Sequence, residues 1–120
     1  MKKALIGAFG ALILTGPAMA EGYSTVDLGL INDKPACMAK AERVMNRYKN
    51  TFGAHSVKVG GWTTFGWDFE PGDQDVVILC VAPTSSSNSK RRGVMVIHGS
   101  GTEKQRFATR DLLQGYWDAD

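Results

Sequence analysis

The chain has 120 residues, of which 43% are hydrophobic and 22% charged, with 14 Gly and 4 Pro. This composition excludes a disordered chain and a collagen-like or low-complexity one, and the length suits one domain. The net charge of +2 comes from Lys2 and Lys3, because residues 21–120 hold 12 bases and 12 acids.

The first twenty residues are typical of an export signal. Lys2 and Lys3 are followed by an apolar run from Ala4 to Leu14 and by the small-x-small motif Ala18-Met19-Ala20. The apolar run is shorter than the ~20 residues that a membrane-spanning helix needs. We therefore predict a signal peptide at 1–20 and one exported domain at 21–120, periplasmic or secreted, with no membrane attachment after cleavage.

Two cysteines remain in the predicted mature chain, Cys37 and Cys80. In an oxidising compartment such a pair is expected to form a disulfide. The chain-entropy model values the closure of a loop of this length at about 4 kcal/mol. A zinc site made with His55 and His98 is the alternative, but the spacing lacks the close ligand pairs of such sites, and we predict no metal.

The first half of the mature chain predicts a short strand at 26–30 and then a helix. Asn32-Asp33-Lys34-Pro35 has the polar cap and early proline of a helix start, and Gly53 the residue type of a helix end. Between them one apolar stripe recurs at steps of three and four: Cys37, Ala41, Val44, Tyr48 and Phe52. The opposite face is basic, which favours a solvated surface over a site for an anionic partner.

The second half predicts strands followed by a helix. Period-two alternation from Val57 to Phe69 indicates one strand interrupted by glycines, and Glu70 to Asp75 an acidic turn. Residues 76–82 and 94–98 indicate two more strands, separated by a polar Ser-rich loop. Thr102 and Gln105 have the spacing of a capping box at the start of a final helix.

These elements predict an α+β fold in the order (β)-α-β-β-β-α. We expect a three- or four-stranded antiparallel meander, two helices and one disulfide.

The disulfide orients the central predicted strand. If Cys80 faces the first helix, then Val77, Leu79 and Val81 face away from it. The alternation from Val57 to Phe69 places Trp62 on that same far side, and Phe65, Trp67 and Phe69 on the core side. The far face is covered by the second helix, by a second copy of the chain, or by another partner. If it is open, Trp62, Val77, Leu79 and Val81 form a partner-binding surface.

The segment His98-Gly99-Ser100-Gly101 is a weaker candidate. Free N–H groups at the following helix start could bind an anion near His98, Ser100 and Gly101. The spacing matches neither a nucleophile elbow nor a dinucleotide loop. It gives no catalytic residue and no cofactor, and a plain turn is the favoured interpretation.

The sequence therefore favours a small exported protein that is not an enzyme and that binds a protein partner or itself. An envelope inhibitor or an immunity-type protein is one form of this function. Three bases at Lys90-Arg91-Arg92 are too few to indicate a nucleic-acid tract. The alternative is a small hydrolase that uses His98 and Ser100.

Overall fold

The computed structural model describes residues 21–83 and 89–120. Its order is β-α-β-β-β-β-α, with these elements: β1 Gly22–Ile31, α1 Lys34–Phe52, β2 Ser56–Val59, β3 Thr63–Phe69, β4 Gln74–Val81, β5 Arg91–Gly99 and α2 Glu103–Ala119. The five strands form one antiparallel sheet in the order β1-β5-β4-β3-β2. The signal peptide predicted at 1–20 lies outside the described residues.

The α+β prediction is confirmed, and its strand count is corrected from three or four to five. The segment predicted as one interrupted strand from Val57 to Phe69 forms two strands, β2 and β3. Gly60 and Gly61 lie in the turn between them, where the Gly60 amide donates to the Thr63 carbonyl at 2.7 Å. The glycines that indicated a bend therefore mark a complete reversal of the chain.

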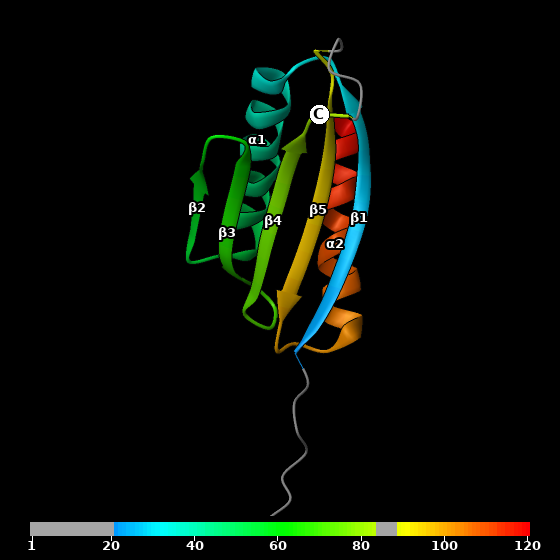
Figure 1. Cartoon of the computed structure of the whole chain (residues 1–120). Coiled ribbons are helices and arrows are strands. Elements are labelled where there is room, and N and C mark those ends of the chain that lie inside the picture. The colour runs from blue at the N-terminus through cyan, green and yellow to red at the C-terminus, as the bar shows by residue number, and fades with distance from the viewer. Residues whose placement is uncertain (1–20, 84–88) are drawn as a thin grey trace, which may run out of the picture.

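Within residues 21–83 and 89–120 both helices pack on the same face of the sheet, and the other face carries no helix (Figure 1). The core between helices and sheet takes the predicted apolar stripe of α1 except Phe52, which is exposed, and alternate residues of the central strands, among them Val76, Ile78, Met95 and Ile97. The expected coverage of the second face by α2 is thus not found. Instead α2 lies beside α1, under β5 and β1.

Local chemistry determines where the helices begin and end. The Asp33 carboxylate accepts from the Ala36 amide at 2.8 Å, and Gly53 ends α1 at a φ of 101°. At the start of α2 the predicted capping box is present, because Thr102 and Gln105 satisfy each other's backbone amides.

The predicted disulfide is confirmed. Cys37 in the first turn of α1 is bonded to Cys80 in β4, with their Cα atoms 6.0 Å apart, and both side chains are buried. The bond attaches the start of α1 to the helix-covered face of β4, so Val77, Leu79 and Val81 lie on the face that carries no helix.

A buried polar network joins both helices to the turn between β3 and β4. The Tyr48 hydroxyl donates to the Glu70 carbonyl at 2.7 Å and lies 3.1 Å from Thr109 Oγ1. Gln74 Nε2 donates to the same Thr109 oxygen at 2.9 Å. Burial raises the pKa of Tyr48, so the neutral hydroxyl is the form that the network holds.

Candidate functional site

The face of the sheet without helices is the candidate site. Directly opposed residues of antiparallel strands share a face, and the register places Phe65 opposite Val77 and Val77 opposite Val96. One level further along, Thr63, Leu79 and Val94 are opposed in the same way. The apolar residues on this side of the three central strands, which also carries Thr63 and Asp75, are Phe65, Trp67, Val77, Leu79, Val81, Val94 and Val96. We call this set the open face.

The open face includes two aromatic residues that the sequence pattern places in the core. Phe65 and Trp67 are 38% and 37% exposed, whereas Thr64 is fully buried on the helix side. The rings of Phe65 and Trp67 stack with centroids 5.7 Å apart. The prediction that these two side chains lie with Phe69 in the core is therefore wrong.

A bulge in β3 is the reason. The register between β3 and β4 shifts between Gly66 and Phe69, and Asp68 there adopts a φ of 52°. The bulge reverses the alternation, so Phe69 is fully buried although Trp67, two positions earlier, is exposed. The Phe69 ring lies over Gly66, where an added Cβ would come within 2.4 Å of Phe69 Cε1.

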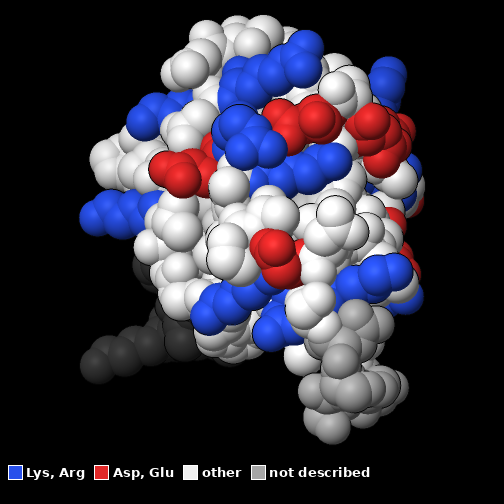
Figure 2. Space-filling view, turned by 90° about the horizontal axis from the view of Figure 1, so that it is seen from above, with Lys and Arg blue, Asp and Glu red and all other residues white. Residues whose placement is uncertain are grey.

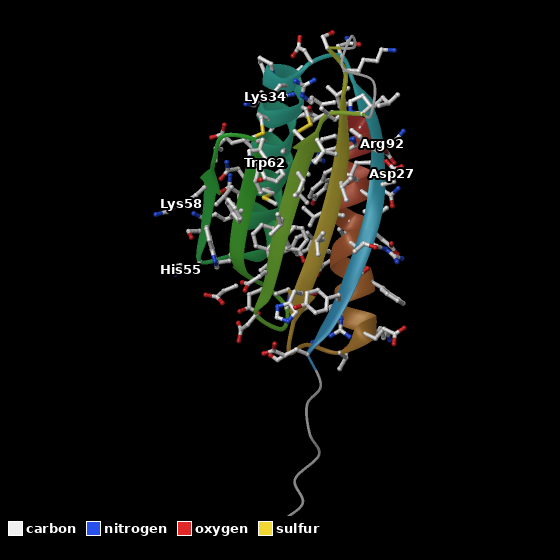
Figure 3. All side chains as sticks on the ribbon, viewed as in Figure 1. Asp27, Lys34, His55, Lys58, Trp62 and Arg92 are labelled. Atoms are coloured by element: carbon white, nitrogen blue, oxygen red, sulfur yellow. A yellow bond between two sulfur atoms is a disulfide. The ribbon has the colours of Figure 1, made fainter. Side chains whose placement is uncertain are left out.

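Trp62 lies just before β3, beside the disulfide end of β4. Its carbonyl accepts from the Cys80 amide at 2.9 Å, and the residue lines a hollow of about 330 Å³ with Lys34, Cys80, Val81, Ala82 and Arg91. Figure 3 shows Trp62 near Lys34, at the start of α1. Trp62 is 53% exposed. The expected binding surface of Trp62 with Val77, Leu79 and Val81 stays a prediction, and Phe65 and Trp67 are the aromatic residues of the open face that the sequence pattern did not assign to it.

At the far end of the open face His98 is held by two residues at the start of the described chain. Its Nε2 lies 3.0 Å from a Glu21 carboxylate oxygen, and its ring stacks on Tyr23 with centroids 4.4 Å apart. Sequence reasoning missed this carboxylate, because Glu21 is distant along the chain and arrives only through the pairing of β1 with β5.

Several polar groups near the predicted anion site at His98, Ser100 and Gly101 are engaged. Arg106 donates to the carbonyls of Gly99 and Gly101, and the capping box uses the amides of Thr102 and Gln105. Ser100 is exposed, and within the described chain no hydrogen bond joins its hydroxyl to His98. Both the anion site and the hydrolase alternative remain predictions.

A lysine lies at one edge of the open face and an ion pair at the other (Figure 3). Lys58, opposite Phe65 in the register, is at the β2 edge. At the other edge Asp27 of β1 forms an ion pair with Arg92 of β5. The Gly29 amide, which donates to Asp27 at 2.8 Å, and then Arg92 lower the pKa of this carboxyl, so it is ionised at neutral pH.

The basic side of α1 is engaged within the molecule. Arg43 binds the Asp120 carboxylate at 2.6 Å, Arg47 lies over the ring of Tyr116, and Lys40 lies over that of Trp117. A shallow hollow of about 550 Å³ lies along the same helix, between Glu42 and Thr51. Figure 2, viewed from the end of the molecule where α1 begins, shows acidic side chains between the Lys and Arg side chains.

In residues 21–83 and 89–120 no three His, Cys, Asp or Glu side chains gather closely enough to hold a metal ion. No helix in that part of the chain has the length and apolar character needed to span a membrane. Comparison with family models, with curated proteins and with solved structures finds no match to this chain.

Proposed function

We propose that this protein is a non-enzymatic binding protein that acts outside the cytoplasm, periplasmic or secreted, and holds a protein partner on its open face. One observation carries the proposal: Phe65 and Trp67 lie exposed beside a continuous row of aliphatic side chains that no helix covers. Large contiguous apolar surfaces on soluble domains mark interaction sites.

The shape of the surface favours a protein over a small molecule. Small ligands bind in concave pockets, whereas the open face extends across β3, β4 and β5 on one side of a sheet. Protein interfaces combine an apolar centre that contains aromatic residues with a charged rim. The open face combines aliphatic residues of the central strand β4 and aromatic residues of β3 with Lys58 at one edge and the Asp27–Arg92 ion pair at the other.

Two observations support the location. The first twenty residues have the charge, apolar run and cleavage motif of an export signal. The bond between Cys37 and Cys80 suits an oxidising compartment. A secreted enzyme inhibited through the open face is one form of the function, by analogy with other small disulfide-bonded inhibitors.

Photo-crosslinking in cells tests the proposal. A photoreactive phenylalanine analogue at position 96 lies on the open face, and the same analogue at position 39 lies on the exposed side of α1. We expect protein adducts from position 96 and none from position 39. Equal adducts from both positions, or none from either, contradict a binding role for this face.

A matched pair of tryptophan variants sharpens the test. Both Trp62 and Trp67 are partly exposed, but only Trp67 is on the open face. Trp67→Ala should remove the adducts formed at position 96, because buried tryptophans dominate interface energies. Trp62→Ala should leave them unchanged. The reverse result would transfer the binding role to the hollow beside the disulfide.

A further inference from the structure

Cys80 positions two sides of the hollow at the disulfide end of the sheet. Its sulfur is bonded to Cys37 in the first turn of α1, and its amide donates to the Trp62 carbonyl at 2.9 Å. Lys34 lies three positions before Cys37, so both residues share one side of the helix. Lys34 and Trp62 are therefore both held beside the end of β4, as Figure 3 shows.

A second cation reaches the hollow from β5. Arg91 lines it and begins the strand, next to the pair that Arg92 forms with Val81 of β4. One guanidinium nitrogen of Arg91 donates to the carbonyls of Ser89 and Lys90. Its other N–H groups donate to no residue in 21–83 or 89–120. Part of the planar guanidinium is thus open to a ligand.

Two more donors at the hollow have no acceptor. Within the described parts of the chain Lys34 forms no ion pair, because the neighbouring Asp33 carboxylate accepts from the Ala36 amide. The Trp62 indole N–H donates to nothing in the same residues, although the corresponding group of Trp117 is hydrogen-bonded. None of the residues that line the hollow is acidic. Unpaired donors that include an ammonium and a guanidinium suit an anionic ligand.

The hollow also has an apolar part, which a bare inorganic ion would leave unused. Val81 and Ala82 line it together with Trp62, which is 53% exposed. A flat indole packs well against another ring. The volume of about 330 Å³ is at the lower end of the ~300–1,000 Å³ of small-molecule sites, which is room for one ring and its acid group.

From this combination we propose that the hollow binds a small aromatic carboxylate. Its ring packs on the Trp62 indole, and its carboxylate accepts from the Arg91 guanidinium and lies close to the Lys34 ammonium. The hollow shares only Val81 with the open face. The inference therefore adds a second binding site, for a small molecule, to the surface proposed for a protein partner.

Nuclear magnetic resonance of the purified, disulfide-bonded protein tests the proposal, because the three tryptophans report on three places. Trp62 is at the hollow, Trp67 on the open face and Trp117 in the core. Titration with phenylacetate should shift the indole N–H signal of Trp62, identified by its loss in Trp62→Phe, and leave the other two in place. No shift beyond that caused by sodium chloride at equal ionic strength, or a shift of the Trp67 signal instead, overturns the proposal.

Two probes that each lack half of the ligand separate its chemical features. Acetate carries the charge without the ring, and phenylacetamide carries the ring without the charge. Phenylacetate should bind at least ~5-fold more tightly than either, because the stacked ring and the charged hydrogen bonds both contribute. Equal affinity for acetate would indicate a plain ion site, and equal affinity for phenylacetamide a plain apolar surface. Either result overturns the proposal.

Charge variants test the two cations. Arg91→Gln should raise the phenylacetate dissociation constant ~10-fold or more, because a charged donor is lost. Lys34→Gln should raise it by about 2–5-fold, as expected for an exposed charge. Lys104→Gln is the matched control, since Lys104 is an exposed lysine in the first turn of α2, and it should leave the constant unchanged. Equal weakening by Lys34→Gln and Lys104→Gln would show general charge attraction and refute the site.

Discussion

Two phenylalanines of β3 test the bulge that creates the open face. Phe69 is fully buried and its ring stacks on Tyr48 with centroids 5.1 Å apart, whereas Phe65 is 38% exposed. The same substitution, to alanine, should therefore have unequal effects although the two residues are four positions apart in one strand.

The magnitude follows from burial. Phe69→Ala leaves a cavity between Tyr48 and Gly66, and truncation of a buried phenylalanine costs ~3–5 kcal/mol. In a domain of this size that corresponds to a fall in Tm of roughly 12–40 °C. Phe65→Ala leaves no enclosed cavity, so its cost should be about 1 kcal/mol, or ~4–8 °C.

Thermal unfolding followed by circular dichroism in dilute solution, where self-association is minimal, measures both values. Equal losses, or a greater loss for Phe65→Ala, would show that Phe65 is a core residue. Phe65 would then be a core residue, as the uninterrupted alternation from Val57 to Phe69 predicts, and the open face would lose one of its two aromatic residues.

Three further predictions concern the rest of the fold. Intact-mass analysis should detect no free thiol, and Cys80→Ser should lower the Tm by more than ~10 °C, because the bond is worth about 4 kcal/mol. In chemical denaturation, Gly93→Ala should lower the free energy of unfolding by ~1–3 kcal/mol, because the added Cβ would lie 2.9 Å from Trp117. Gly115→Ala, in open space within α2, should raise the free energy of unfolding by up to ~1 kcal/mol. The hydrogen bond from Arg43 lowers the pKa of Asp120 below its unfolded value near 3.8, so Asp120→Asn should lower the free energy of unfolding at pH 7. In denaturation experiments the difference in this free energy between Asp120→Asn and the original protein should vanish as the pH falls through the folded pKa.

The parts of the fold that could be predicted from sequence are those with local causes. The cap at Asp33, the stop at Gly53 and the capping box at Thr102 each depend on residues within a few positions, and all three are present. The disulfide could be predicted because only one pairing of Cys37 and Cys80 exists. Strand alternation then placed Val77 and Leu79 on the side away from the first helix, while coverage of that side by the second helix stayed open.

The parts that could not be predicted depend on tertiary contacts. Period-two alternation assumes an unbroken strand, and the positive φ of Asp68 that breaks it carries no clear signal in the residue type. The buried face of α2 includes Arg106 and Thr109 while Phe107 is exposed. Arg106 is accommodated because the carbonyls of Gly99 and Gly101 accept from it and because Gly22 has no side chain in its way.

The strand order also constrains how the chain can fold as it is synthesised. Strands β2 to β5 pair with neighbours that follow closely in sequence, but β1 pairs only with β5. Tyr23 can therefore pair with His98 only after β5 has been synthesised. Contacts this distant along the chain form slowly, because a long loop must close before they are gained. The first strand synthesised is thus the last to find its neighbour, and until then one edge of β5 remains without a partner strand.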